Sequence, residues 1–306
     1  MYDIIILGAG PAGMSAAVYL ARKKLKTLIL TKDLGGQTAM SGKVENYLGF
    51  KSISGAELSQ RFYEHVQEYK DFVEIHMEEP ASDLSKQKNG KFLIKTKTGE
   101  YSSICVIIAS GKLPKKLNVP GENKLLKRGV TYCATCDAPL FTKKDVAIIG
   151  GGNSAMDAGV QLMRIANKVH IITINEELMG DSILKEMLEK ANNVSIIKKA
   201  QITQIYGEKS VEGIKVNADG KQKDIKVKGV FIEIGSYPSV QFAKDIEKNQ
   251  YNEIRLIKGE RTNIEGIFAC GDVTEVAEKQ TIIAAGDGAK AAIQAYEYIT
   301  HKGYGW

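Results

Sequence analysis

The sequence predicts an α/β fold built from two doubly wound domains. Two glycine-rich turns, which begin at Gly8 and Gly150, carry this prediction because each follows a short apolar run and precedes a helical segment. A strand, a tight turn and a helix in this order open a βαβ unit, and its duplication indicates two modules. We therefore expect two Rossmann-like three-layer nucleotide-binding domains, the second inserted into the first.

The elements of the two modules follow in the same order. In the first module, a strand, the glycine turn, a helix and a second strand are expected at residues 4–7, 8–13, 14–22 and 27–30. In the second module, the corresponding segments are residues 146–149, the turn at 150–155, a helix to about residue 166 and a strand at 169–174.

Glycine and proline residues punctuate the rest of the chain. Residues 111–121 are expected to form a crossing linker, and a second punctuated stretch at 235–238 follows an expected strand at 230–234. A helix-like stretch at 281–299 closes the chain. The expected domains are residues 1–113 together with 243–306, and an inserted domain at residues 114–242.

Composition is that of an ordinary globular protein. The chain has 306 residues, 43% of them hydrophobic and 25% charged, and no stretch approaches the roughly 18 to 20 apolar residues that span a bilayer. The N-terminus lacks the pattern of a signal peptide, so we expect a cytoplasmic protein without a membrane partner. The net charge of +6 indicates either a lysine-rich solvated surface or attraction of an acidic partner. Nucleic acid is not favoured, because the basic residues are dispersed.

The four cysteines are too few for a disulfide scaffold, and a lone CxxC argues against structural zinc. Cys133-Ala-Thr-Cys136 has the spacing of a small redox-active disulfide, which often lowers one thiol pKa. Asp137 follows directly and has the chemistry to protonate a leaving thiolate. A structural disulfide or a metal site is the alternative interpretation. Cys105 and Cys270 are expected to pack in the core, with an additional redox thiol as the alternative role for Cys270.

Taken together, the motifs resemble those of low-molecular-weight thioredoxin reductases from end to end. The blocks that carry the resemblance are Gly8-Ala-Gly-Pro-Ala-Gly13, Gly35-Gly-Gln37, Val44-Glu-Asn46, Cys133-Ala-Thr-Cys-Asp137, Gly150-Gly-Gly-Asn-Ser-Ala155, Gly271-Asp272, and Lys279-Gln280 before Ala284-Ala-Gly286. Ala109-Ser110-Gly111 departs mildly from the family's Ala-Thr-Gly but keeps the hydroxyl group.

The resemblance implies that FAD binds in the first domain, with its pyrophosphate at the first glycine turn. Asp272 is then expected to bind the ribityl chain, and Gln280 and Thr281 to approach the isoalloxazine. The expected cofactor-binding residues are Gly8, Gly10, Pro11, Ala12, Gly13, Gly36, Gln37, Asn46, Ala109, Gly111, Gly271, Asp272, Lys279, Gln280 and Thr281. No metal is expected.

The same resemblance implies the catalytic roles and the partners. Cys136 is expected to face the flavin, Cys133 to attack the partner's disulfide, and Asp137 to act as the acid. In that family the partner is thioredoxin, the enzyme is a homodimer, and the domains rotate so that the dithiol alternates between flavin and thioredoxin.

One departure concerns the electron donor. Family members that use NADPH carry a His-Arg-Arg run and a further arginine after the second strand of the inserted domain. Here residues 173–180 read Thr-Ile-Asn-Glu-Glu-Leu-Met-Gly, without an arginine. Each lost charge-assisted contact costs about 1.5 to 3 kcal/mol. Losing three weakens binding about a thousandfold or more, at about 1.4 kcal/mol per decade.

Reduced ferredoxin is the donor we favour, because some clostridial members of the family that lack the clamp use it. Ferredoxins are generally acidic, and a basic reductase attracts them. NADH use, or weak NADPH use, is the alternative. A flavin-binding redox sensor that never turns over, and a reductase serving a peroxidase-type partner, are further alternatives. At the C-terminus, Tyr304 or Trp306 is expected either to belong to a disordered tail or to stack near the flavin.

Overall fold

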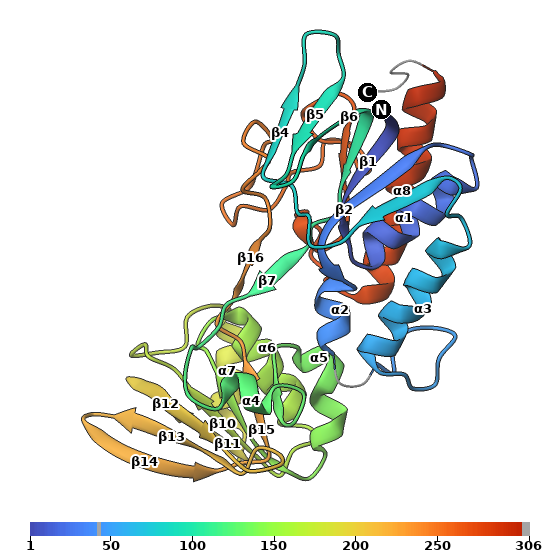
Figure 1. The fold of residues 1–306 in the computed structure, drawn as a ribbon. Helices are drawn as coiled ribbons and strands as arrows, with labels where there is room; N and C mark the ends of the chain where they lie inside the picture. The colour runs from blue at the N-terminus through green and yellow to red at the C-terminus, as the bar shows by residue number, and fades with distance from the viewer. Residues whose placement is uncertain (42–43, 302–306) are drawn as a thin grey trace. The chain divides into compact units, whose positions relative to one another are not determined.

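A computed structural model describes residues 1–41 and 44–301, and its architecture confirms the predicted α/β fold class (Figure 1). The chain forms two compact units. The first contains Met1–Met40, Tyr47–Leu113 and the chain from Tyr237 onward, and the second contains Pro114–Ser236 together with the described residues 41 and 44–46. Among the described residues, no helix has both the length and the apolarity needed to cross a bilayer.

The first unit contains a seven-stranded sheet. Its strands are β1 (Tyr2–Ala9), β2 (Thr27–Leu34), β3 (Val73–His76), β4 (Asp83–Lys86), β5 (Phe92–Lys95), β6 (Glu100–Ile108) and β17 (Ile267–Ala269). Their order is β3-β2-β1-β6-β5-β4, and β17 pairs with β6. The pairs that involve β1, β3 and β17 are parallel, whereas β4, β5 and β6 form an antiparallel extension.

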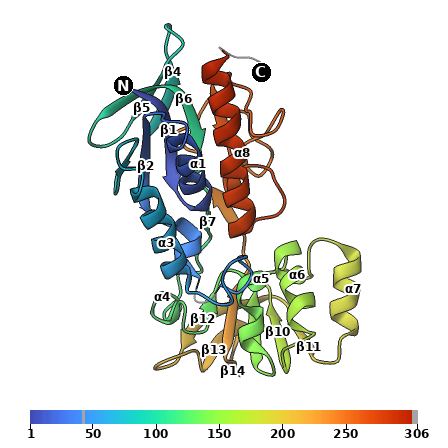
Figure 2. The ribbon, with the colours of Figure 1, turned by 90° about the vertical axis from the view of Figure 1, so that its right-hand side faces the viewer.

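Alternating side chains of β1 serve two cores on opposite faces of this sheet. Ile4 and Ile6 belong to the core that contains the helices, while Ile5 and Leu7 pack in a core with Phe242. The helices of this unit are α1 (Pro11–Ala21), α2 (Gly36–Met40), α3 (Gly55–Gln67) and α8 (Thr281–Thr300). Figure 2 shows α8 alongside α1. A Cβ on Gly288 of α8 would lie 2.0 Å from the Ala12 carbonyl oxygen, so this crossing requires glycine.

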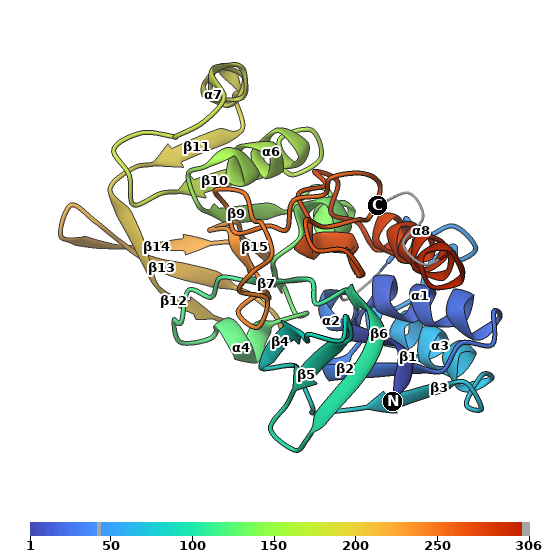
Figure 3. The same cartoon turned by 90° about the horizontal axis from the view of Figure 1, so that it is seen from above.

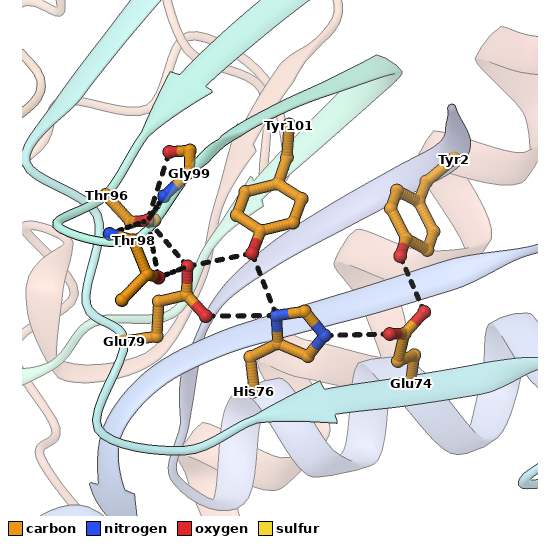
Figure 4. Close-up of polar contacts among 8 residues, drawn as sticks. All are labelled: Tyr2, Glu74, His76, Glu79, Thr96, Thr98, Gly99 and Tyr101. Carbon is orange, nitrogen blue, oxygen red and sulfur yellow. Dashed lines mark hydrogen bonds and ion pairs between the residues drawn. The ribbon is translucent and has the colours of Figure 1, made fainter.

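A polar cluster ties strands of this sheet together (Figure 4). Tyr2 of β1 donates a 2.6 Å hydrogen bond to Glu74 of β3, whose other oxygen lies 2.7 Å from His76 Nε2. His76 Nδ1 lies 3.0 Å from Glu79 Oε2. Burial raises the pKa of Glu79, but several hydrogen bonds outweigh it and hold that pKa at about 2. The hydroxyl groups that donate to Glu79 are those of Thr96, Thr98 and Tyr101.

The second unit has three layers (Figure 3). A parallel sheet contains β8 (Val130–Thr131), β9 (Asp145–Ile149), β10 (Lys168–Ile172), β11 (Val194–Ile197) and β15 (Gly229–Ile232), in the order β11-β10-β9-β15-β8. An antiparallel sheet contains β12 (Ala200–Tyr206), β13 (Gly213–Ala218) and β14 (Lys221–Lys226). The helices are α4 (Glu122–Leu125), α5 (Ala134–Asp137), the 3-10 turn η1 (Ala138–Phe141), α6 (Asn153–Leu162) and α7 (Ser182–Lys190).

Alternating side chains of β9 point to opposite faces of the parallel sheet, which explains the layers of this unit. Val146 and Ile148 pack in the core that contains α6, whereas Ala147 and Ile149 pack in the core shared with β12 and β13. The chain crosses between the units through β7 (Lys112–Pro114) and β16 (Ser236–Pro238), which pair with each other. The compact units divide between Leu113 and Pro114 and between Ser236 and Tyr237.

In the first unit, β1 and β2 are longer than predicted, and α1 begins three residues earlier, at Pro11. Three C-terminal ends in the second unit also differ from the sequence prediction. The strand expected at 169–174 ends at Ile172, because the Thr173 hydroxyl accepts a hydrogen bond from the Asn175 amide and turns the chain. The strand expected at 230–234 ends at Ile232, where Glu233 begins a bend. The helix expected to reach about residue 166 ends at Leu162.

Candidate active site

The first glycine turn joins β1 to α1, and two of its glycines serve the packing of the protein itself. Gly8 has a φ of +114°, and a Cβ there would lie 2.4 Å from the Ala109 carbonyl oxygen. A Cβ on Gly13 would lie 1.9 Å from the Gly8 carbonyl oxygen. Both positions therefore require glycine, whether or not a ligand is bound.

Gly10 is different, because a Cβ there would meet no atom within 4 Å. Its backbone is extended, with φ −78° and ψ −178°, so any residue would fit the turn. Gly10 caps α1 without a side-chain hydrogen bond, and Pro11 follows it in the first turn. Uncapped helix amides beside open space are the arrangement that binds phosphate groups, so this turn fits a dinucleotide pyrophosphate.

Distant segments of the first unit meet beside this turn. Gln37 Nε2 donates a 3.1 Å hydrogen bond to Asp272 Oδ2, and the hydroxyl groups of Thr38 and Thr281 lie 3.0 Å apart. Asp272 belongs to the 3-10 turn η2 (Gly271–Val273). Gly271 has a φ of +72°, and a Cβ on it would lie 3.1 Å from the Ala12 Cβ. The structure thus brings together Ala12, Gln37, Gly271, Asp272 and Thr281.

Two lysines surround a largely buried carboxylate in the same unit. Lys112 donates a hydrogen bond to Glu253, and Lys279 Nζ lies 3.7 Å from the same oxygen. Lys279 also donates a 2.5 Å hydrogen bond to the Thr274 carbonyl oxygen. Burial lowers the pKa of Lys279, and the neighbouring Lys112 adds to this effect. Burial also raises the pKa of Asp272, although both lysines oppose it.

The other expected cofactor residues lie at turns and element ends. Ala109 follows β6 and donates through its amide to the Leu7 carbonyl oxygen. Gly36 and Gly111 have positive φ values of +53° and +65°, and a Cβ at either would meet no atom within 4 Å. Gln280 is the N-cap of α8, and Asn46 is exposed after α2. Tyr304 and Trp306 lie outside the described residues.

The Cys133–Cys136 disulfide begins α5 in the second unit. Cys133 is the N-cap residue of this short helix, and its sulfur accepts a 3.2 Å hydrogen bond from the Cys136 amide. Both cysteines are partly exposed. By contrast, Cys105 and Cys270 are free thiols whose pKa is raised by complete burial, which makes them unreactive.

Asp137 lies directly after the disulfide and is only 7% exposed. Burial raises the pKa of this carboxyl group, while a hydrogen bond from Thr131 opposes the shift. The Thr131 hydroxyl also accepts a 3.1 Å hydrogen bond from the Cys133 amide. A carboxyl group with a raised pKa holds its proton closer to neutral pH, as a proton donor to a thiolate requires.

Glu233 is a site residue that the motifs did not reveal. Its carboxylate accepts a 3.3 Å hydrogen bond from the Ala134 amide, between the two cysteines. Burial raises the pKa of Glu233 to about 7. The signal that indicates it is topological, because β8 and β15 are neighbouring parallel strands whose carboxyl ends meet at one edge of the sheet.

The second glycine turn shows the same division of roles as the first. A Cβ on Gly150 would lie 2.2 Å from the Glu233 carbonyl oxygen, and one on Gly151 would lie 2.3 Å from the Thr173 hydroxyl. Gly152 caps α6 without a side-chain hydrogen bond, and its nearest neighbour would be the Met179 carbonyl oxygen at 3.9 Å. Packing therefore explains two glycines, and the third leaves room at the helix N-terminus.

Residues 173–180, where the family's arginine clamp would lie, contain apolar side chains and two carboxylates but no cation. Ile174, two residues after the end of β10, is 74% exposed. Glu176 forms a 2.6 Å ion pair with Lys199, and Glu177 pairs with Lys185. Each of these carboxylates is thus paired with a lysine. The segment contains no arginine, so it presents no guanidinium group to a phosphate.

Comparison with known proteins matches this geometry to one family. Residues 2–291 match the model of the pyridine nucleotide-disulphide oxidoreductase family. A thioredoxin reductase structure from Streptococcus pyogenes is similar, with a TM-score of 0.92 and 34% identity, covering 98% of this chain and 99% of that one. The likeness therefore extends over both units.

Two curated relatives are longer than this chain. An alkyl hydroperoxide reductase component from Staphylococcus aureus (strain MRSA252) is 38% identical, and the match covers 97% of this chain and 59% of the relative. NADH dehydrogenase from Bacillus subtilis (strain 168) is 37% identical, with 97% and 58% covered. The chain thus spans about three fifths of the length of these relatives.

Family members of the thioredoxin reductase and alkyl hydroperoxide reductase types are FAD-binding flavoproteins. The first unit fits this cofactor, since it combines an open Gly10, an uncapped α1 and the buried Asp272. FAD is therefore the cofactor of this chain. With a family match over nearly its whole length and a redox disulfide in its second unit, the chain belongs to the pyridine nucleotide-disulphide oxidoreductase family.

Proposed function

We propose that the chain is an FAD-dependent thioredoxin-disulfide reductase. One observation carries the proposal: a partly exposed Cys133–Cys136 disulfide lies beside a buried Asp137 in a flavoprotein of this family. Similarity to solved thioredoxin reductases supports it. A structural disulfide would have no use for an adjacent proton donor, whereas thiol–disulfide exchange does.

In this proposal, FAD bound in the first unit would supply the two electrons that the Cys133–Cys136 disulfide needs to become a dithiol. The Cys133 thiolate then attacks the partner's disulfide and forms a mixed disulfide with one partner sulfur. Asp137 protonates the sulfur that leaves. The Cys136 thiolate next attacks Cys133, which re-forms the internal disulfide and releases the partner as a dithiol. The second released sulfur takes the proton that Cys136 gives up when it ionises, and Asp137 regains its proton from solvent. Each cycle thus moves two electrons and two protons to the partner.

The cofactor residues are assigned in the same proposal. The first glycine turn would hold the pyrophosphate, and Gln37, Asp272 and Thr281 would lie along the cofactor. Gly36, Asn46, Ala109, Gly111, Lys279 and Gln280 complete the set. The proposed domains are residues 1–113 with 243–306 and residues 114–242, although the compact units divide six residues earlier at the second boundary, between Ser236 and Tyr237. The enzyme is taken as a cytoplasmic homodimer.

We further propose that reduced ferredoxin, and not NADPH, is the electron donor. The segment after β10 supports this, because Ile174 is exposed where a cation would be needed and the two carboxylates hold the neighbouring lysines. The chain's charge of +6 favours encounter with an acidic protein. Of the five lysines proposed for this contact, at positions 112, 115, 116, 124 and 127, the last four are exposed, whereas Lys112 is paired with Glu253.

One observation favours the alternative of NADH. Gly152 leaves the N-terminus of α6 uncapped and open, so the second turn retains the features of a phosphate site. NADH needs no cation for a 2′-phosphate, so the missing arginines would not penalise it. The similarity to a protein named NADH dehydrogenase agrees with this alternative.

Trapping a mixed disulfide tests the partner and the order of the cysteines. The reduced Cys136→Ser variant, incubated with oxidised thioredoxin, should accumulate a covalent adduct through Cys133, whereas Cys133→Ser should not. A thiol peroxidase in its disulfide form serves as the competing partner. If the adduct forms only with the peroxidase, thioredoxin is not the partner. If neither protein is trapped, the redox sensor is the better interpretation.

An anaerobic titration tests the donor. NADPH, NADH and reduced ferredoxin are added in parallel while the visible band of the flavin is followed. Bleaching at catalytic speed by ferredoxin alone supports the proposal. Bleaching by micromolar NADPH contradicts it, because another part of the second unit would then bind the phosphate.

A further inference from the structure

Glu233 connects the two chemical features of the second unit. Its main chain packs against the second glycine turn. The Glu233 amide donates a 2.8 Å hydrogen bond to the Ile149 carbonyl oxygen, and a Cβ on Gly150 would meet the Glu233 carbonyl oxygen. Its side chain reaches the other way and accepts the Ala134 amide inside the CxxC turn. The residue therefore joins the end of β9 to the disulfide.

Strand order explains why a residue at this position reaches the disulfide. β15 lies between β9 and β8 in the parallel sheet, with Val230 opposite Val130 and Phe231 opposite Thr131. The chain leaves β8 at Thr131 and enters the CxxC turn, while β15 ends at Ile232 and continues into Glu233. Both segments leave the same edge of the sheet side by side.

We propose that Glu233 is a positioning residue of the Cys133–Cys136 dithiol, whose side chain fixes the Ala134 amide and whose charge controls how readily the dithiol ionises. This inference rests on the proposed function, in which the dithiol carries the electrons. It assigns a role to a side chain outside the CxxC-Asp motif.

Two carboxylates and one lysine come from described elements near Glu233. Asp157 on α6 is an exposed carboxylate that raises the Glu233 pKa, after the larger effect of burial. Asp137 lies on α5 with the two cysteines. The Lys115 amide donates a hydrogen bond to the carbonyl oxygen of Gly235, which lies two residues after Glu233 in the chain. β8 and β9 contribute apolar residues and Thr131 at their adjacent ends.

The consequence is a coupled titration. A thiolate and an ionised Glu233 repel each other, so each raises the pKa of the other. Below about pH 7 the carboxyl group is neutral and does not oppose thiolate formation. Above that pH the charge of Glu233 disfavours the thiolate. The reactivity of the dithiol therefore increases less steeply with pH than that of an isolated thiol.

The test compares Glu233→Gln with the wild-type protein, both with FAD bound. Glutamine keeps the shape and an oxygen that can accept the Ala134 amide, but it cannot ionise. The dithiol is reduced with dithiothreitol, excess reagent is removed anaerobically, and the rate of iodoacetamide alkylation is measured from pH 5 to 9. No donor protein and no thioredoxin are needed, so failure of the proposed function would not alter the readout.

We expect the variant to show a thiol pKa lower by about one unit, which for a thiol of ordinary pKa makes alkylation about fivefold faster near pH 7.5. The wild-type profile should contain an additional step that the variant lacks. Asp157→Asn should keep that step but move it to lower pH. Glu189→Gln, an equal charge change on the exposed face of α7, should match the wild type.

A Glu233→Gln profile that superimposes on the wild-type profile would overturn the inference and leave Glu233 as a hydrogen-bond acceptor only. If the variant fails to fold, infrared titration of the wild-type carboxyl groups replaces it. A carboxyl group that titrates near pH 7 should then move to higher pH when the disulfide is reduced. An unchanged position would equally contradict the coupling.

Discussion

Substituting Gly10 by alanine separates cofactor binding from the stability of the fold. The extended backbone at Gly10 accepts alanine, and the added methyl group would meet no atom within 4 Å. Losing a favourable N-cap residue costs about 0.5 to 1 kcal/mol, while the less flexible unfolded chain returns about 0.4 to 1 kcal/mol. The free energy of unfolding of the apoprotein should therefore change by less than about 1 kcal/mol.

The matched control is Gly13→Ala. Its methyl carbon would lie 1.9 Å from the Gly8 carbonyl oxygen, a backbone atom that cannot swing away. The strand and helix would have to separate, at a cost of about 1 to 3 kcal/mol or more. This variant should lose stability with or without FAD.

The assay has two parts. Calorimetry of the apoproteins should give Gly10→Ala the same unfolding temperature as the wild type and Gly13→Ala a lower one. Titration of each apoprotein with FAD, followed by quenching of flavin fluorescence, should show Gly10→Ala weakened by about tenfold or more, which is about 1.4 kcal/mol. Wild-type FAD affinity in Gly10→Ala would refute the assignment of this turn to the pyrophosphate.

Three further predictions concern the dithiol and the donor. Asp137→Asn should slow thioredoxin reduction by about a hundredfold or more in stopped-flow experiments, with an unchanged flavin spectrum, because an amide cannot protonate the leaving thiolate. From pH 5 to 8, wild-type stability should fall relative to Glu233→Gln by up to about 3 kcal/mol in urea unfolding. Burial raises the folded-state pKa of Glu233 from 4.5 to about 7, so the folded protein binds this proton more tightly than the unfolded chain does. The stability that the proton contributes is therefore complete below pH 4.5 and is lost as pH rises through 7. Turnover with ferredoxin should decrease as ionic strength rises, and a rate that is flat with salt would contradict electrostatic attraction.

The sequence was sufficient for features that depend on local pattern. Apolar runs before Gly8 and Gly150 located β1 and β9, and the helix expected at 281–299 is α8 within one residue at its end. Glycine turns and alternating apolar residues encode these elements directly, because the strand and helix periods differ.

The sequence was insufficient wherever distant segments meet. Gln37 and Asp272 are 235 residues apart, and their hydrogen bond follows from sheet order, which no local pattern specifies. Glu233 escaped notice for the same reason, since it is an ordinary strand-end glutamate until β15 is placed next to β8. Thr173 ended β10 early because its hydroxyl accepts the Asn175 amide, a side-chain effect that apolar periodicity does not contain.

The most direct test of the central claim is anaerobic turnover with thioredoxin as the sole acceptor. Wild-type protein, Cys133→Ser and Cys136→Ser are each supplied with reduced ferredoxin, NADH or NADPH, and the free thiols of thioredoxin are counted with time. We predict many turnovers by the wild type with ferredoxin, little with NADPH, and none by either variant. Equal turnover in a cysteine variant, or efficient turnover with NADPH alone, would contradict the proposed route of the electrons.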